Sequence, residues 1–240
     1  MNHADDKRRG FTLIELMLAM TFISILLIAI ALTILQIVNI YNHGITLKDV
    51  GQAGQTISSD VEQSINGSAP FTISGAGSKY VPQTWGGRLC LGNYSYIWNY
   101  GPALQIGVLP IPTRNLYVGE PTTLTANSNP IKFVKVVDGG GIYCSSPNSN
   151  IDPTNAVELL NIGDHNLAVH SFAITSEASA LDSKTGERLY NITFVIGTND
   201  LTALIADGSA CKAPTVSGSD VAFCSVQQFN VVAAAGNTVE

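Results

Sequence analysis

Residues 7–40 read KRRGFTLIELMLAMTFISILLIAIALTILQIVNI, and this stretch decides what kind of protein the chain is. Three basic residues open it, and from Leu16 to Leu47 the chain holds no Asp, Glu, Lys or Arg. About 20 apolar residues in a helix cross the hydrocarbon layer of a membrane, so this run is long enough to span one. Because Lys and Arg resist translocation, the basic cluster predicts a cytoplasmic N-terminus and places the bulk of the chain outside.

The composition of the whole chain excludes two broad classes of protein. Its 240 residues are 45% hydrophobic and only 12% charged, whereas an ordinary soluble domain carries about 25% charged residues. So much apolar material excludes a disordered chain. The formal net charge of -6 argues against a nucleic-acid binder, which needs a basic face. A local patch around Lys132 and Lys135 leaves nucleic acid open as a partner.

Two simpler interpretations of the apolar run are a secretory signal peptide and a plain membrane anchor. The apolar part of a signal peptide runs for about 7–15 residues and ends in a small-residue cleavage site. This run is longer and ends in polar or amphipathic residues, Gln36, Asn39, Tyr41 and Asn42. Glu15 argues against a plain anchor, because an ionisable group at membrane depth is costly and usually functional.

The stretch from Lys7 to Met20 resembles the class III signal sequences of type IV prepilins and of the related pseudopilins. In that family a short basic leader ends in Gly, the next residue is usually Phe, and a Glu follows as the fifth residue of the mature chain. Here these residues are Gly10, Phe11 and Glu15. The resemblance is close over residues 7–20 and does not extend as readable identity beyond residue 65.

The resemblance implies specific roles for the residues of this motif. A prepilin peptidase would cleave the Gly10–Phe11 bond and N-methylate Phe11, and Gly10 lacks a side chain that would keep a protease away from the bond. Glu15 would pair with the Phe11 amine, commonly that of a neighbouring subunit, and so set the register of assembly. The leader would be recognised through its three basic residues, Lys7, Arg8 and Arg9.

Beyond the apolar run, hydrophobic residues recur at steps of three or four, at Val50, Ala53, Ile57, Val61 and Ile65. This spacing predicts that the helix continues as an amphipathic helix. The expected organisation is a basic leader at 1–10, a transmembrane and assembly helix at 11–42, the amphipathic half of the helix at 43–66, and an extracytoplasmic β-rich head at 67–240. The expected fold class is α+β, with the long helix packed on an antiparallel sheet in a pilin-like way.

The segment after residue 67 is rich in Gly, Ser, Pro, Asn and Thr and contains short apolar runs, which is typical of strands and long loops. Strands are expected at residues 95–100, 104–109, 131–137, 168–175, 190–197 and 222–232. The clearest hairpin joins residues 170–176 to 190–197 through a turn at 182–186, because apolar positions alternate on both arms. Alternation also puts four aromatic residues on one face of a strand, as core or as a ligand-contacting platform: Tyr94, Tyr96, Trp98 and Tyr100.

All four cysteines lie in the part that is expected to be exported: Cys90, Cys144, Cys211 and Cys224. Their even number favours disulfides over free thiols and allows three pairings. Resemblance to type IV pilins, which carry a C-terminal loop bounded by a disulfide, favours Cys211 with Cys224 and Cys90 with Cys144. Zinc is the alternative, although the sequence has no CxxC and no His pair near a cysteine.

Motifs that would indicate catalysis are missing from the sequence. Asp164, His165 and His170 do not have the spacing of HExxH or a comparable metal motif. The sequence has no GxSxG elbow and no Walker A loop. The chain is therefore expected not to be an enzyme and to hold no cofactor or metal, and the resemblance to prepilins implies that it is instead the substrate of one.

These features favour a subunit of a type IV pilus. The large head, the two expected disulfides and Leu32, where many pilins have Pro, favour a minor pilin. The resemblance implies three partners, namely the prepilin peptidase, other pilins in a helical filament, and the inner-membrane assembly platform. Adhesion, motility and DNA uptake are expectations from the family, since fold does not fix function.

The expected location is the inner membrane before assembly, as a single-pass protein, and an extracellular pilus or a periplasmic pseudopilus afterwards. Within the family, the alternative function is that of a pseudopilin of a type II secretion system. The alternative from another class is a single-pass, membrane-anchored binding domain that does not polymerise.

Overall fold

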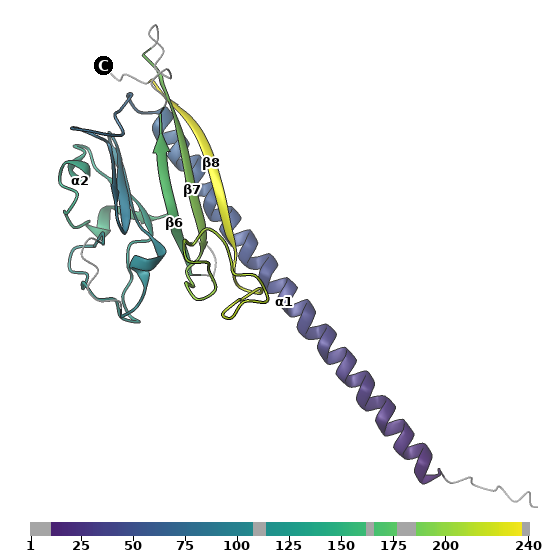
Figure 1. The fold of residues 1–240 in the computed structure, drawn as a ribbon. Helices are drawn as coiled ribbons and strands as arrows, with labels where there is room; N and C mark the ends of the chain where they lie inside the picture. The colour runs from purple at the N-terminus through teal and green to yellow at the C-terminus, as the bar shows by residue number, and fades with distance from the viewer. Residues whose placement is uncertain (1–10, 108–113, 162–165, 177–185, 237–240) are drawn as a thin grey trace, which may run out of the picture. The chain divides into compact units, whose positions relative to one another are not determined.

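The computed structural model describes residues 11–107, 114–161, 166–176 and 186–236, in two compact units, Met1–Asn42 and His43–Glu240. Its helices are α1 (Leu13–Asn66) and α2 (Ile142–Ser145), with short 3₁₀ turns η1 (Gly101–Leu104) and η2 (Pro153–Asn155). Its strands are β1 (Tyr80–Gln83), β2 (Gly86–Leu91), β3 (Tyr94–Asn99), β4 (Phe133–Val137), β5 (Ala156–Glu158), β6 (Leu167–Thr175), β7 (Arg188–Thr198) and β8 (Val226–Ala235) (Figure 1). The expected α+β fold class, a long apolar helix followed by antiparallel sheets, is confirmed.

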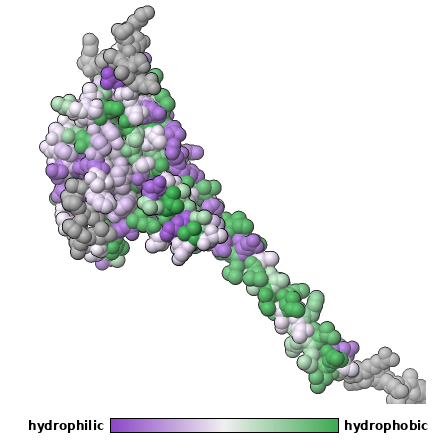
Figure 2. Space-filling model, viewed as in Figure 1, coloured by the Kyte–Doolittle hydropathy of each residue, from purple (hydrophilic) through white to green (hydrophobic). Residues whose placement is uncertain are grey.

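The first unit consists, in its described part, of the apolar portion of α1. Every residue from Phe11 to Tyr41 is exposed, and Figure 2 shows this portion as a mostly hydrophobic surface. Its Ser and Thr hydroxyl groups, on Thr21, Ser24 and Thr33, donate to backbone carbonyls of the same helix, as Ser24 Oγ does to Met20 O at 2.8 Å. Polar groups satisfied within the helix are what a hydrocarbon environment requires.

The second unit contains two antiparallel sheets that pack against residues 43–66 of α1. The strand orders are β1-β2-β3-β4-β5 and β6-β7-β8. The apolar positions that recur along this part of α1 are all fully buried, at Val50, Ala53, Ile57, Val61 and Ile65. They share one hydrophobic core with side chains from both sheets. The amphipathic pattern of the sequence therefore marks the face on which the head is built.

Gly54 allows β8 to lie close to the helix. A Cβ at this position would come within 2.0 Å of the Phe229 Cζ, whereas a Cβ on Gly51 would lie 3.6 Å from the nearest atom, the Gln227 side-chain oxygen. The Phe229 ring stacks on that of Phe194, with ring centroids 5.3 Å apart. Gly54 is therefore required for helix–sheet packing, and α1 continues without interruption through it.

The alternating aromatic residues of β3 belong mainly to the core. Tyr96 and Trp98 are fully buried, and the Trp98 ring packs against those of Phe172 and Phe133, with ring centroids at 4.3 and 5.7 Å. Tyr94 is the exception, because it is 42% exposed at the edge of the core. The ligand-platform interpretation therefore fails for the two buried aromatic rings.

Four of the expected strands correspond to β3, β4, β6 and β7, and β6 pairs antiparallel with β7 as the expected hairpin requires. Most of its turn, residues 182–185, lies outside the described residues. The expected strand at 104–109 is wrong over its described part. Residues Gly101–Leu104 instead form the 3₁₀ turn η1, with Pro102 near its start, and the backbone then turns at Gly107, whose φ is +74°.

The last expected strand, at 222–232, begins later than predicted, at Val226. The Asp220 carboxylate accepts hydrogen bonds from the backbone N–H groups of Ala222 and Phe223, at 3.2 and 3.0 Å, and this makes a turn where the strand was expected to start. Strands β1, β2 and β5 were not expected, because Pro82, Gly86 and Gly87 resemble loop residues in the sequence.

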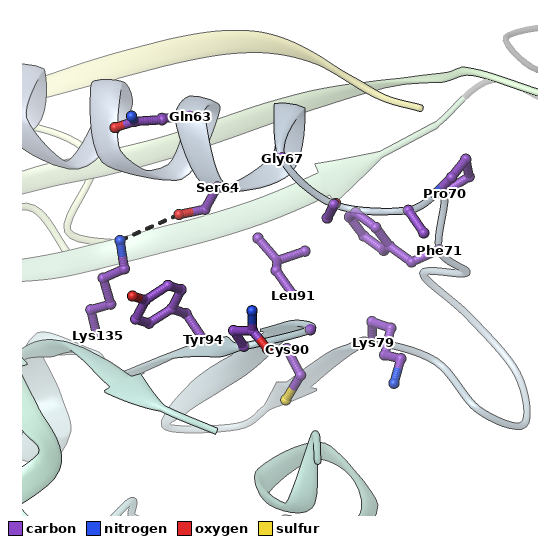
Figure 3. Close-up of a pocket in the computed structure, with 14 residues that line it drawn as sticks. Gln63, Ser64, Gly67, Pro70, Phe71, Lys79, Cys90, Leu91, Tyr94 and Lys135 are labelled. Carbon is purple, nitrogen blue, oxygen red and sulfur yellow. Dashed lines mark hydrogen bonds between the residues drawn. The ribbon is translucent and has the colours of Figure 1, made fainter. Parts of the chain in front are cut away.

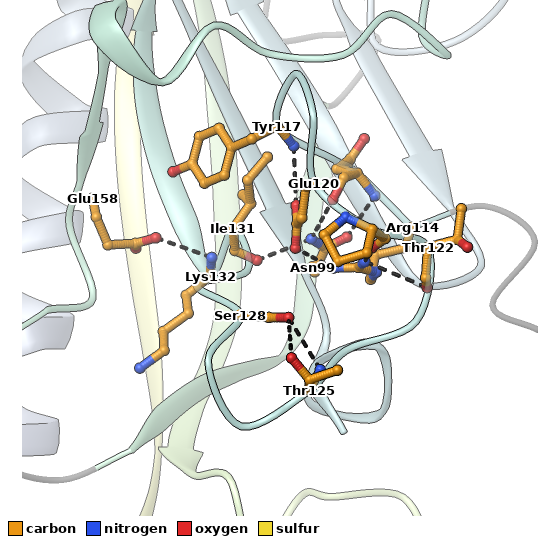
Figure 4. A network of polar contacts seen from close by, with 12 residues as sticks. Asn99, Arg114, Tyr117, Glu120, Thr122, Thr125, Ser128, Ile131, Lys132 and Glu158 are labelled. Atoms are coloured by element: carbon orange, nitrogen blue, oxygen red, sulfur yellow. Dashed lines mark hydrogen bonds and ion pairs between the residues drawn. The ribbon is translucent and has the colours of Figure 1, made fainter. Parts of the chain in front are cut away.

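Residues 114–132, in the described part of the segment between η1 and β4, contain a buried ion pair. Arg114 Nη1 lies 2.6 Å from Glu120 Oε1, with side-chain exposures of 1% and 6% (Figure 4). Arg114 Nη2 donates to Pro121 O at 2.7 Å, and the Tyr117 N–H donates to Glu120 Oε2 at 3.0 Å. These bonds hold a turn that has little regular secondary structure of its own.

Candidate assembly and processing site

The first turn of α1 is closed by a capping box. Thr12 precedes the helix, and its backbone N–H and its hydroxyl donate to Glu15 Oε2 at 3.0 and 2.9 Å. In return the Glu15 N–H donates to Thr12 Oγ1 at 3.3 Å. A Thr followed three residues later by a Glu satisfies free N–H groups at a helix start in this reciprocal way. The spacing Thr12-x-x-Glu15 is visible in the sequence, so Glu15 has a role in capping besides the one that its charge suggests.

This cap fixes where the helix begins in relation to the expected cleavage point. Phe11 and Thr12 are not helical, and the first helical residue is Leu13. The Phe11 side chain is 87% exposed. Gly10 and the basic residues of the leader, Lys7, Arg8 and Arg9, lie outside the described residues. The structure thus brings the Glu15 carboxylate next to Thr12, the residue that directly follows the expected new N-terminus at Phe11.

Helix α1 is also the candidate membrane span of the chain. In the described residues it is the one helix that is long and apolar enough to cross a membrane, a judgement that rests on length and composition. None of its most apolar window is buried in the protein. A signal sequence near the N-terminus passes the same test. The residues at the start of the helix therefore decide between a signal sequence and a membrane anchor.

The four cysteines form two disulfides, Cys90–Cys144 and Cys211–Cys224. This is the pairing favoured by the resemblance to pilins. In this structure no cysteine thiol remains free. Among the described residues, no group of three or more His, Cys, Asp and Glu side chains could hold a metal ion. Asp164 and His165 lie outside them.

His170 is part of the packing of the head. Its Nε2 lies 3.2 Å from Thr198 O, and burial lowers the pKa of the imidazole below its ordinary value. The neutral ring is therefore the form that the folded head prefers. A group whose pKa is depressed by folding stabilises the folded state above its unfolded pKa, about 6.5 for His, and loses this contribution as the pH falls.

We accordingly expect the thermal unfolding midpoint of the protein to decrease when the pH is lowered from 7.5 to 5. The decrease should be smaller in a His170→Gln variant. Glu158, whose pKa is raised by burial, acts in the opposite direction in both proteins. The difference between the two pH profiles therefore isolates His170. Parallel profiles for the two proteins in thermal unfolding would show that His170 makes no such contribution.

Comparison with known proteins identifies the N-terminal segment. Residues 5–35 match the model of the prokaryotic N-terminal methylation motif. No curated protein and no solved structure matches the chain. The matched residues include the basic leader, the capping box and the first half of the candidate membrane span. The N-terminal segment of this chain is therefore a class III signal sequence of the type IV prepilin kind, which supports a membrane-anchored precursor of a pilin-type or pseudopilin-type subunit.

Proposed function

We propose that the chain is the precursor of a minor type IV pilin. In this proposal the leader 1–10 is recognised by a prepilin peptidase through Lys7, Arg8 and Arg9, and the Gly10–Phe11 bond is cleaved. Phe11 is then N-methylated. Residues 11–42 form the assembly helix, residues 43–66 attach it to the head, and the head 67–240 is displayed outside. The observation that carries the proposal is the methylation motif placed directly before an apolar helix that starts at Leu13.

The start of α1 supports cleavage at this bond. Proteases act on extended backbone, and the N-cap at Thr12 ends the helix before Phe11 is reached. Cleavage would create an α-amino group at Phe11 with an ordinary pKa of about 7.7–8.0. A cation there is costly next to lipid unless a carboxylate pairs with it. Glu15 is the one carboxylate between Phe11 and Asp49.

We expect Glu15→Ala to lower incorporation into filaments about tenfold or more while leaving leader cleavage intact, because the Phe11 ammonium of a neighbouring subunit loses its partner. Incorporation is measured as the ratio of this protein in sheared fibres to that in membranes. Glu15 also caps its own helix, so the charge and the cap must be separated.

Two matched variants separate them. Glu15→Gln keeps a capping-box residue and removes the charge, whereas Thr12→Ala removes the cap at a cost of about 1 kcal/mol and keeps the charge. We expect Glu15→Gln to behave like Glu15→Ala and Thr12→Ala to remain near the unmodified protein. The reverse order would assign Glu15 to capping and remove its proposed role in pairing.

Mass spectrometry of the mature N-terminus tests the proposal as a whole. An N-methylated Phe11 is the expected result, and an intact Met1 would favour a membrane-anchored domain that does not polymerise. The large head with two disulfides supports a minor subunit over the bulk subunit of the fibre. Low abundance in sheared surface fibres is the expected result for a minor pilin. Dependence of protein secretion on this chain, without such fibres, would favour a pseudopilin of a type II secretion system.

The proposal also sets the location and the partners of the chain. It begins as a single-pass inner-membrane protein with a cytoplasmic N-terminus and is moved by the assembly platform into a helical filament with other pilins. The head would then serve adhesion, motility or DNA uptake. A structural subunit of this kind has no catalytic role of its own.

A further inference from the structure

The end of α1 borders a wide cleft in the described part of the head. Its volume is about 730 Å³, within the range of about 300–1,000 Å³ that is typical of small-ligand sites. The cleft is lined by the last turn of α1, the following residues 67–71 and the turn between β2 and β3, together with Lys79 and Lys135 (Figure 3). We call it the helix-end cleft.

The helix-end cleft is positively charged within an acidic protein. Two lysines and no Asp or Glu are among its described lining residues, although the chain has a net charge of -6. Lys135 is partly compensated, because its Nζ lies 3.0 Å from Asp60 Oδ1 outside the lining. Within the described ranges neither ion pair includes Lys79. The cleft therefore offers one uncompensated ammonium and one that is shared with a carboxylate.

Tyr94 adds a fixed aromatic surface beside these charges. The Lys135 Nζ lies 4.5 Å from the Tyr94 ring centroid, in the range of a cation–π contact. The ring remains 42% exposed and lies near Leu91 in Figure 3. The polar lining comes mainly from side-chain amides and hydroxyls, namely Gln63, Asn93, Ser64 and Ser68.

We propose that the helix-end cleft binds a saccharide that carries a carboxylate. The apolar C–H face of a pyranose ring packs on the Tyr94 ring, and its hydroxyls bond with amides and hydroxyls. Lys79 and Lys135 lie at opposite ends of the cleft in Figure 3, so carboxylates on different sugar units of an oligosaccharide pair with them separately. Charge-assisted hydrogen bonds of this kind are the strong polar contacts of such a site. Two lysines, one of them already paired, are too few for the run of phosphate contacts that a nucleic acid makes.

The position of the cleft suits a ligand that arrives from outside the cell, and in this respect the inference rests on the proposed function. Gln63 lies 20 residues after His43, where the second unit begins. At about 1.5 Å per residue this is about 30 Å along the helix. All the lining residues belong to the second unit, which the proposed function displays outside the cell.

The test is to titrate the full-length protein in detergent micelles with trigalacturonate and to measure binding by isothermal titration calorimetry. We expect trigalacturonate to bind about tenfold more tightly than neutral galactotriose, and the affinity to fall as salt is raised. Lys79→Gln and Tyr94→Ala should each weaken binding about five- to tenfold. Lys212→Gln is the matched control, because this lysine lies outside the lining and binds Thr202 O.

Several results would overturn the proposal once unfolding midpoints show that the variants are folded. These are an absence of trigalacturonate binding, equal binding by Lys79→Gln, or equal affinity for galactotriose. If a single-stranded oligonucleotide bound more tightly than trigalacturonate, and this binding were lost in Lys79→Gln, the ligand of the cleft would be a nucleic acid and not a saccharide. The N-terminal mass of the same preparation keeps the two proposals apart: binding with an intact Met1 contradicts only the proposed function, and a mature Phe11 without binding contradicts only the saccharide.

Discussion

Replacing Cys90 and Cys144 together by Ala is expected to lower the free energy of unfolding by about 4 kcal/mol. The disulfide joins residues 54 positions apart and ties β2 to α2. In the chain-entropy account, a cross-link stabilises a protein by restricting its unfolded state, and the effect grows with the length of the closed loop. Ala is the suitable replacement because Cys90 is 1% exposed and a Ser would bury an unpaired hydroxyl.

The folded head should still form in this variant, because a second set of contacts holds the same segment. Arg88 donates to Tyr143 O and Ser149 O, at 3.2 and 2.9 Å, on the two sides of the cysteine. Urea unfolding of the full-length protein in detergent, followed by tryptophan fluorescence, measures the loss. The Cys211→Ala/Cys224→Ala variant is the matched control.

That control opens a loop of only 13 positions, so its expected loss is smaller, about 3 kcal/mol. A larger loss for the short loop than for the long one would contradict the unfolded-state account. It would indicate that native contacts around Cys211 and Cys224 contribute more than the restriction of the chain.

The helix and its buried face could be predicted from the sequence because the signals are local. An uncharged run of helical length and apolar residues at steps of three or four need no knowledge of the rest of the chain. Val50, Ile57 and Ile65 are fully buried for this reason. The capping box is equally local, and Thr12 could have been found from its spacing to Glu15.

The parts that could not be predicted depend on contacts between distant segments. Gly86 and Gly87 resemble a loop in the sequence, yet they belong to strand β2. Only glycine fits at these two positions, because a Cβ would collide with the backbone and the ring of Trp98. Arg88 resembles a surface residue, yet it is 1% exposed. Burial lowers the pKa of the Arg88 guanidinium to about 10, and its charge is satisfied by groups from residues 115, 143 and 149.

The helix-end cleft is hidden in the sequence for the same reason. Lys79 and Lys135 are separated by more than fifty positions and by three strands. Only the antiparallel order β1-β2-β3-β4 brings both to the end of α1. The sequence patch that seemed relevant, Lys132 with Lys135, does not form the cleft, because Lys132 is not part of its lining.

The second large effect is expected at the buried ion pair between Arg114 and Glu120. Glu120→Ala should destabilise the head by about 3–5 kcal/mol, because it leaves an uncompensated guanidinium in the interior. The side chain of Arg114 is 1% exposed and keeps Pro121 O as an acceptor at 2.7 Å. The same substitution removes the acceptor of the Tyr117 N–H. Urea unfolding of the full-length protein measures the change.

A double variant distinguishes the buried charge from the geometry of the turn. Arg114→Met with Glu120→Leu removes both charges and keeps apolar volume, and such replacements of buried pairs are often neutral. We therefore expect it to recover most of the stability lost in Glu120→Ala. The partly exposed pair of Lys135 and Asp60, with side-chain exposures of 22% and 27%, supplies the comparison, and Lys135→Met should cost about 1 kcal/mol or less. If the double variant were as unstable as Glu120→Ala, the cost would belong to the lost Tyr117 hydrogen bond, and the unpaired charge of Arg114 would not be its cause.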